Sequence, residues 1–417
     1  MPSKKQLSAL IFCGLATALM IGWFPRSHAT QLRDTQAPLA QLPKTFPREK
    51  AMQSVYRITT TDGQTRNTTI NPKLQAHLSQ FIEAKGNPVA AVVVLEAATG
   101  NILALAQGQN PKTWGSETHT ALYSGFPAAS LFKTVVSATA IEIAGLDGDS
   151  AFPLWGGCAD VRRTGVWMRD DVVGRRHKMS LKRAYGQSCN GFFAKLVVNQ
   201  LGLHSVVNFA KRFGWDQTIP ADFLTESSPL GSPQPKSASV HTVGRFGAGF
   251  GYVGTSAVHA AWLTNAIAND GLTKPIRLFQ DTPNHIHGPV SLNENYAQTS
   301  TQIISATTAT KLRQISKATV QGGTASFAFR KGRHARLRYK VGGKTGTLSG
   351  KAPKGVNTWF AGYMPVEKPE VVVAAIVVLE DLWHIKGPNL AAEAFWAYQD
   401  LKKENSRIAR RFKRNTR

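Results

Sequence analysis

The chain has 417 residues, of which 42% are hydrophobic and 18% are charged, and it carries 50 Lys and Arg against 25 Asp and Glu. This composition excludes a disordered chain, a collagen-like fibre and a membrane protein with several spans, and the length allows a sizeable core. The net charge of +25 favours polyanions or an acidic surface as partners.

The N-terminus has the pattern of an export segment. Lys4 and Lys5 precede an almost uncharged stretch from Leu7 to Phe24, and Ser27-His28-Ala29 follows it. A basic flank, an apolar core and a small-x-Ala ending are typical of a signal peptide, and about 18 apolar residues lie at the lower limit for spanning a bilayer. We predict that residues 1–29 are a cleaved signal peptide or a single membrane anchor. The remainder is then expected on the extracytoplasmic, periplasmic side.

The rest of the chain is predicted to fold as α+β. Residues 30–66 lack a sustained period and are expected to form a linker. Apolar periodicity predicts helices near residues 71–82, 130–145, 191–201, 255–269 and 389–401. Strand patterns occur at 90–95 and 102–106, which read as a hairpin, and at 337–347, 358–363 and 371–379. These positions predict one antiparallel sheet built from both chain ends, with a large helical insertion, in a domain over residues 67–401.

The tail and the cysteines leave alternatives open. Residues 402–417 hold eight Lys or Arg and one acid, so we expect a solvated, unstructured tail, or else adhesion to anionic lipid or wall polymer. In an oxidising compartment Cys158 and Cys189 could form a disulfide, and otherwise they would be two buried thiols. No Cys or His spacing suits zinc, so neither a metal nor a cofactor is expected.

Three short motifs carry the chemistry, in the order Ser130-Leu131-Phe132-Lys133, Ser188-Cys189-Asn190 and Lys344-Thr345-Gly346-Thr347. The first two are weak signals alone, because each should arise about once by chance in a chain of this length. Ser130, however, opens the only Ser-x-x-Lys, and Lys344 opens the only Lys-Thr-Gly. Their order and local contexts make the set specific.

The first motif has the residues of an activated nucleophile. Ser130 and Lys133 are three apart at the start of a predicted helix, so the amine can reach the hydroxyl. A neutral lysine can take the serine proton, and both burial and the nearby Lys344 would favour the neutral form. We therefore predict Ser130 as nucleophile rather than as a simple helix cap.

The other two motifs supply groups for a substrate. The hydroxyl of Ser188 can relay a proton, and the amide of Asn190 can hold a substrate amide, although Ser188 could also cap the next helix. Lys344 and the hydroxyls of Thr345 and Thr347 can bind a carboxylate. Gly346 lets a substrate backbone lie close to the strand, and a backbone N–H beyond it could share an oxyanion hole with that of Ser130.

The three motifs resemble those of the serine penicillin-recognising enzymes, which are the penicillin-binding proteins and serine β-lactamases. Similar sequence covers about residues 68–400, including Thr99-Gly100-Asn101, Gly249-Phe250-Gly251 and Trp359-Phe360-Ala361-Gly362-Tyr363. Asn71 stands where Asp is usual. The resemblance implies a β-lactamase/transpeptidase-like fold of the class B type, but residues 30–66 leave no room for the class B pedestal domain or for a glycosyltransferase domain.

By this resemblance the chain is a D,D-transpeptidase that cross-links peptidoglycan. Ser130 would attack the bond between the last two D-alanines of a stem peptide, with Lys133 as base, Ser188 as relay and Asn190 as amide holder. Lys344 and Thr347 would bind the terminal carboxylate, and β-lactams would acylate Ser130. The implied partners are stem peptides, β-lactams, a separate glycosyltransferase and, through an uncleaved N-terminus, the membrane. The anionic stems suit a basic surface that includes Arg330, Lys331, Arg333, Arg336 and Arg338.

Other functions remain open at this point. A β-lactamase needs a base for fast deacylation, but Glu226 lacks the Glu-x-x-x-Asn setting of class A enzymes. A D,D-carboxypeptidase differs only in using water as acceptor. A non-catalytic β-lactam sensor or wall-binding module is the alternative from another class, and export argues against nucleic acid as a partner.

Overall fold

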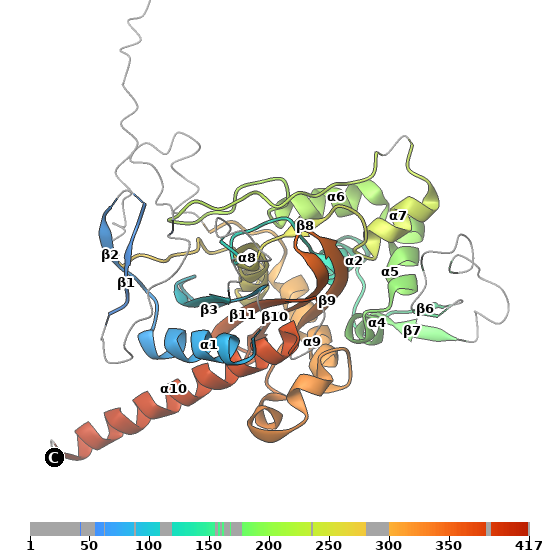
Figure 1. Ribbon diagram of the computed structural model, residues 1–417. Helices are drawn as coiled ribbons and strands as arrows, with labels where there is room; N and C mark the ends of the chain where they lie inside the picture. The colour runs from blue at the N-terminus through green and yellow to red at the C-terminus, as the bar shows by residue number, and fades with distance from the viewer. Residues whose placement is uncertain are drawn as a thin grey trace, which may run out of the picture.

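A computed structural model of the chain (Figure 1) describes residues 42, 55–61, 63–86, 89–108, 119–154, 157–158, 161, 167, 177–234, 237–280, 300–380 and 385–415. Its centre is a five-stranded antiparallel sheet in the order β4 (Ile102–Gly108), β3 (Val89–Glu96), β11 (Val371–Leu379), β10 (Lys354–Met364) and β9 (Gly342–Lys351). Strands from both chain ends therefore form one sheet, and the predicted hairpin is confirmed as β3–β4.

Both faces of the sheet are covered by helices (Figure 1). On one face lie α1 (Pro72–Ala84) and α10 (Gly387–Asn415), and on the other lies α8 (Ala257–Ala268). Successive side chains of a strand point to opposite faces, so β11 alternates between two cores: Val372 and Ile376 pack on the α8 side, and Val373 and Val377 pack on the α10 side. This explains why β11 reads as a continuous apolar run, since no residue of it reaches solvent.

The described chain between β4 and β9 forms the helical insertion. Its helical elements are η1 (Ala129–Phe132), α2 (Lys133–Ala144), α4 (Leu181–Gln187), α5 (Asn190–Leu196), the π-helical turn η3 (Val197–Leu201), α6 (Leu203–Arg212), α7 (Val240–Gly247), α8, α9 (Ala306–Gln321), η4 (Ser326–Phe329) and η5 (Gly332–Leu337). Short strand pairs also occur there: β5 (Phe126–Pro127) with β8 (Gly254–Thr255), and β6 (Ala151–Pro153) with β7 (Lys178–Ser180).

Two predicted boundaries were wrong. Residues 337–347 were expected to form one strand, but Leu337 ends η5, where its side chain is buried and the Nε of Arg338 donates to the carbonyl of Gln321 at 3.1 Å. Strand β9 begins only at Gly342. At the other end, α10 runs on to Asn415, so residues 402–415, expected to be unstructured, continue the helix.

Part of the predicted linker is also folded. β1 (Arg57–Thr59) and β2 (Thr65–Asn67) pair as a small antiparallel hairpin, and Thr68 forms a bridge with Phe279. The predicted export segment at residues 1–29 and most of residues 30–54 lie outside the described residues. Within the described part of the chain, no helix is both long and apolar enough to span a bilayer.

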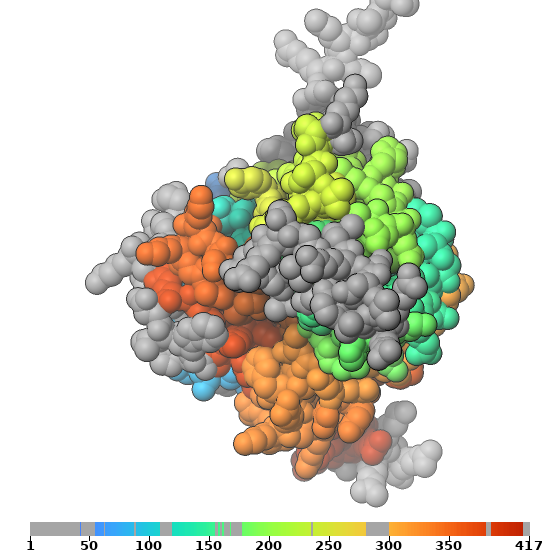
Figure 2. Space-filling model, turned by 90° about the vertical axis from the view of Figure 1, so that its right-hand side faces the viewer, coloured from blue at the N-terminus to red at the C-terminus, as the bar shows by residue number. Residues whose placement is uncertain are grey.

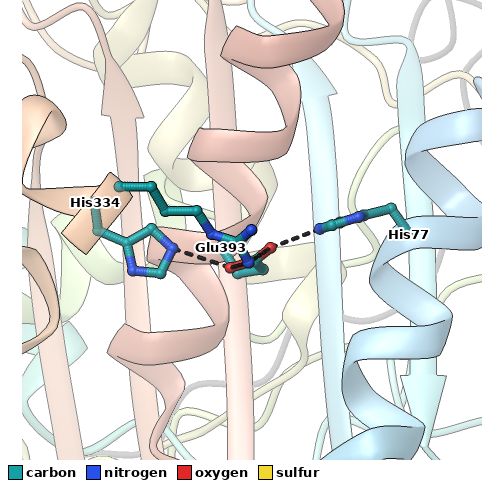
Figure 3. A network of polar contacts seen from close by, with 4 residues as sticks. His77, His334 and Glu393 are labelled. Carbon is teal, nitrogen blue, oxygen red and sulfur yellow. Dashed lines mark hydrogen bonds and ion pairs between the residues drawn. The ribbon is translucent and has the colours of Figure 1, made fainter.

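A buried carboxylate links α10 to two other elements (Figure 3). The side chain of Glu393 has no exposed surface and accepts hydrogen bonds at 2.6–2.9 Å from His77 of α1 and from Arg333 and His334 of η5. The guanidinium of Arg333 also stacks on Trp396, 3.9 Å from the ring centroid. We call these four residues, His77, Arg333, His334 and Glu393, the Glu393 cluster. These contacts hold α1, η5 and α10 together on one face of the sheet.

Candidate active site

Ser130 lies in η1, on a turn that neighbouring elements hold from both sides. The preceding Ala129 has φ +50°, a left-handed conformation that an alanine adopts only when its surroundings impose it. Those surroundings are visible: the N–H of Ala128 donates to Val253 O at 2.8 Å, and Trp359 Nε1 donates to Pro127 O at 3.0 Å. A Cβ on Gly249 would lie 2.1 Å from Ala129 O, so only a glycine allows this approach. The serine is therefore positioned by its backbone.

The second motif forms the junction between α4 and α5. Ser188 ends α4 in a left-handed conformation (φ +56°), and Asn190 begins α5. Between them, Cys189 is bonded to Cys158, which decides the open question of the cysteines in favour of the disulfide. The N–H of Asn190 also donates to Cys158 O at 2.8 Å. The motif is thus held covalently and by a hydrogen bond at the same point.

Lys133 brings the first two motifs together. Its Nζ lies 2.8 Å from Ser130 Oγ, 3.2 Å from Ser188 Oγ, 3.0 Å from Ser188 O and 2.6 Å from Asn190 Oδ1. Lys133 has no solvent exposure. The four predicted residues Ser130, Lys133, Ser188 and Asn190 therefore share one hydrogen-bonded group.

The electrostatics favour a neutral amine at this position. Burial removes the solvent that stabilises an ammonium, and the nearby charge of Lys344 repels it, so the pKa of Lys133 lies well below its usual value. Burial lowers the pKa of Lys344 as well, to about 7. An uncharged lysine beside a serine hydroxyl can act as its base at neutral pH.

The third motif lies on β9, the strand at the edge of the sheet next to η1. Thr345 and Thr347 line the same cleft as Ser130, and Thr345 Oγ1 is hydrogen-bonded to Thr324 Oγ1 at 2.5 Å. Lys344 is 1% exposed, and its Nζ donates to Thr345 O at 3.1 Å and lies over the ring of Tyr185. Lys344 thus lies behind the cleft wall, where its charge acts on Lys133. A Cβ on Gly346 would lie 3.0 Å from Ala128 O, so this glycine allows β9 to pack closely on the segment before Ser130.

The cleft has a volume of about 340 Å³. Its lining residues come from the helical insertion and from β9, β10 and the start of α10. Figure 2 shows this end of the molecule, with green and yellow segments of the insertion above its orange segment, which contains α9. Its lining residues are Ala129, Ser130, Ser188, Asn190, Ala248, Gly249, Phe250, Thr324, Phe327, Thr345, Thr347, Leu348, Thr358, Lys386 and Pro388.

Sequence reasoning missed part of this wall. Phe327, Lys386 and Pro388 line the cleft but belong to none of the three motifs. The basic residues that were expected to attract anionic stems do not line it. Arg330 bonds to Ser326, Arg333 pairs with Glu393, and Arg338 bonds to Gln321, so these side chains support the fold. Among the described residues no group of three or more His, Cys, Asp or Glu side chains could hold a metal ion.

Comparison with known families decides the identity of the fold. Residues 90–395 match the family described as penicillin binding protein transpeptidase domain, which is most of the chain. The chain belongs to the penicillin-binding protein transpeptidase family. The family predicted from the three motifs is thereby confirmed.

The curated relatives that this transpeptidase domain matches are distant. The chain is 25% identical over 340 residues to penicillin-binding protein PbpB of Mycolicibacterium smegmatis and equally identical to PbpB of Mycobacterium tuberculosis, covering 76% of this chain in both cases. It spans about half the length of these curated relatives, 50% and 48%.

Solved structures agree on the fold. The D,D-transpeptidase domain of a peptidoglycan glycosyltransferase from Eggerthella lenta superposes with a TM-score of 0.64 at 22% identity, over 84% of this chain and 96% of that one. A ceftriaxone acyl-enzyme complex of penicillin-binding protein A from M. tuberculosis gives 0.59 at 23% identity, over 80% and 79%. These neighbours confirm the predicted β-lactamase/transpeptidase-like fold.

Proposed function

We propose that this chain is a serine D,D-transpeptidase that cross-links peptidoglycan stem peptides through an acyl-enzyme and is inhibited by β-lactams. The observation that carries the proposal is the 2.8 Å contact between Ser130 Oγ and the buried Nζ of Lys133. A serine beside a lysine of lowered pKa is a nucleophile with its own base.

The partners of Lys133 determine which of its neighbours can lose a proton to it. A neutral amine has two hydrogens and one lone pair. Asn190 Oδ1 and the carbonyl oxygen of Ser188 can only accept hydrogen bonds, so they take the two hydrogens. The lone pair is then left for a hydroxyl, and Ser130 Oγ is the nearer of the two hydroxyls. Asn190 thus orients the base, in addition to the amide-holding role predicted for it.

Acylation follows from this arrangement. The proton of Ser130 Oγ passes to Lys133 as Oγ bonds to the carbonyl carbon between the two terminal D-alanines. Ser188 lies 3.2 Å from the same amine and can return the proton to the departing nitrogen, so D-alanine leaves as the amine and the acyl group stays on Ser130. Attack by the amine of a second stem peptide restores the hydroxyl.

The strand edge suits an extended peptide. β9 is an edge strand, and a peptide backbone can align beside such an edge. Thr345 and Thr347 line the cleft, and their hydroxyls are proposed to hold the terminal carboxylate, with Lys344 behind them. Gly346 does not line the cleft, and a Cβ there would meet Ala128 O, so this glycine allows β9 to pack closely on the segment before Ser130 and is not assigned to the peptide.

The cleft offers little support for fast hydrolysis of an acyl-enzyme. Glu226 is the residue that a class A β-lactamase reading would use, but its Oε2 accepts from the N–H and the hydroxyl of Ser124 at 2.9 and 3.0 Å. No carboxylate is among the described residues that line the cleft. Transfer of the acyl group to an amine is therefore favoured over its fast hydrolysis by a β-lactamase. A D,D-carboxypeptidase is the second candidate.

The test is mass spectrometry of the full chain after exposure to benzylpenicillin. We expect one adduct on Ser130, and Ser130→Ala should abolish it while leaving the melting temperature within a few degrees. Adding a stem-peptide donor with and without an amine acceptor then separates the activities: a cross-linked product indicates the transpeptidase, and release of D-alanine alone indicates the carboxypeptidase. An adduct that persists in Ser130→Ala, or rapid turnover of the penicillin, would refute the proposal.

A further inference from the structure

Lys386 differs chemically from the other residues of the cleft. Among the described residues that line it, Lys386 is the one with an ionisable side chain, and the others are apolar or carry hydroxyl or amide groups. Lys133 and Lys344 are buried behind the wall. Within the described part of the wall, a ligand lying in the cleft therefore meets one ionisable side chain, the amine of Lys386.

The backbone of Lys386 is fixed to the strand that faces the third motif. Its N–H donates to Asn389 Oδ1 at 3.0 Å, and the N–H of Asn389 donates back to Lys386 O at 2.9 Å. The next residue, Gly387, donates its N–H to Thr358 Oγ1 at 2.9 Å, and a Cβ there would lie 2.3 Å from Thr358 O. The start of α10 thus lies directly against β10.

This attachment places Lys386 near the proposed carboxylate site. Thr358, to which Gly387 is attached, is the register partner of Thr347 on β9. Both threonines line the cleft together with Lys386. The cation is therefore on the same wall as the third motif, and Ser130 and Asn190 come from the insertion.

Phe327 supports the side chain of Lys386. The Nζ of Lys386 lies 5.7 Å from the centroid of the Phe327 ring, and that ring, on η4, is 45% exposed. An aromatic face near the ammonium stabilises its charge and favours this position of the side chain at the cleft wall. Lys386 and Phe327 together form a rim that we call the Lys386 rim.

We propose that Lys386 is a specificity-determining residue that binds a carboxylate on the acyl half of the substrate or inhibitor, the half that becomes attached to Ser130. This inference rests on the proposed function, since it requires that Ser130 be acylated. The carboxylate of the leaving half is assigned to Thr345 and Thr347, so a second anionic group on the retained half is the natural partner for a second cation on the same wall.

Two penicillins that differ by one carboxylate test this assignment. Benzylpenicillin and carbenicillin have the same ring system, and carbenicillin adds a carboxylate beside the phenyl ring of the acyl side chain. The measurement is the second-order rate constant of Ser130 acylation for each compound, in the full chain and in Lys386→Met, Lys386→Arg and Lys386→Glu. The ratio of carbenicillin to benzylpenicillin rates removes effects common to both.

In Lys386→Met we expect the ratio to fall roughly fivefold to tenfold, as for loss of one partly exposed charge-assisted hydrogen bond, with benzylpenicillin changed less than about twofold. Lys386→Arg should keep the ratio, and Lys386→Glu should lower it further. Lys368→Met is the matched control, because Lys368 is exposed and does not line the cleft, so the ratio should not change.

Each other outcome is decisive. An unchanged ratio in Lys386→Met and Lys386→Glu would overturn the inference while leaving the proposed function intact. Equal decreases in the acylation rate constants of both penicillins in Lys386→Met and Lys386→Arg would overturn the inference, because Lys386 would then only maintain the structure of the cleft wall. Absence of any adduct in the unmodified chain would instead refute the proposed function, and the inference with it.

Discussion

At the scale of single residues, Lys344 is the clearest case of a group that acts without touching the cleft. It is 1% exposed and lies behind Thr345, yet its charge is one of the two causes that lower the pKa of Lys133. A like charge in a dry environment disfavours a second ammonium strongly, because no solvent screens the pair. Burial is the larger cause, and the position of Lys344 adds to it in extending to lower pH the range in which Ser130 can be activated.

The pH dependence of acylation tests this role. The base must be neutral, so acylation by benzylpenicillin should rise with pH through the pKa of Lys133 and then level off. Lys344→Met removes the repelling charge, so the pKa of Lys133 rises and the acid limb of the profile moves to higher pH. The measurement is the acylation rate constant against pH, with Lys368→Met as the control. An acid limb at the same pH in Lys344→Met would contradict the coupling.

The sequence predicted the cleft residues that belong to the three motifs and missed Phe327, Lys386 and Pro388. Ser130 and Lys133 are one helical turn apart, so their contact follows from local geometry. Lys386 and Phe327 are far apart in sequence and meet only because α10 and η4 pack on the same wall. The depth of Lys344 was also not predictable, because it depends on which side of β9 faces the helices.

At the scale of elements, the Cys158–Cys189 disulfide links the second motif covalently to a distant part of the insertion. Cys189 lies between Ser188 and Asn190, both of which contact Lys133. A Cβ on Gly191 would lie 2.6 Å from Gly157 O, so the segment around Cys158 packs closely on the start of α5. The bond therefore holds the α4–α5 junction against the amine.

Removing this bond should affect both stability and rate. In Cys158→Ser/Cys189→Ser we expect the free energy of unfolding to fall by about 2–4 kcal/mol, and acylation to slow severalfold because Ser188 and Asn190 lose their support. Chemical denaturation and stopped-flow acylation measure the two effects. If the double variant acylates at the unmodified rate, the hydrogen bond from Asn190 to Cys158 is sufficient by itself.

The end of α10 was predicted wrongly because its high content of Lys and Arg was interpreted as a sign of disorder. Residues 402–415 are rich in Lys and Arg, but they contain no Gly or Pro and consist largely of good helix formers. Lys402 pairs with Glu370 at 2.5 Å, and Glu404 pairs with Lys73 of α1 at 2.7 Å, so the helix is tied to the body beyond Leu401. Such tertiary contacts cannot be read from a local window of sequence.

At the scale of the whole molecule, the Glu393 cluster fastens α1, η5 and α10 over one face of the sheet (Figure 3). Burial alone would raise the pKa of Glu393, but hydrogen bonds from His334, His77 and Arg333 outweigh it and hold the pKa well below its usual value. None of the four side chains lines the cleft. Substitutions in the Glu393 cluster should therefore lower the free energy of unfolding without changing the acylation rate.

Glu393→Gln keeps the shape of the side chain and removes its charge, so we expect the free energy of unfolding to fall by about 2–4 kcal/mol at pH 7 with the acylation rate unchanged. The depressed folded pKa contributes stability that is complete above the usual value of 4.5 and is lost as the pH falls below it. The difference in unfolding free energy between the unmodified protein and Glu393→Gln should therefore become smaller at acidic pH. Urea unfolding at several pH values measures it, and a gap independent of pH would argue against a charged Glu393.

The length of α10 has a practical consequence. The helix begins at Gly387, on the rim of the cleft, and continues for 29 residues, which corresponds to about 43 Å of straight helix. Its last turns project from the body (Figure 1). A dye attached near Arg411 would lie a few nanometres from a fluorescent penicillin on Ser130. Energy transfer between the two labels would therefore report the acylation of Ser130 without a label in the cleft.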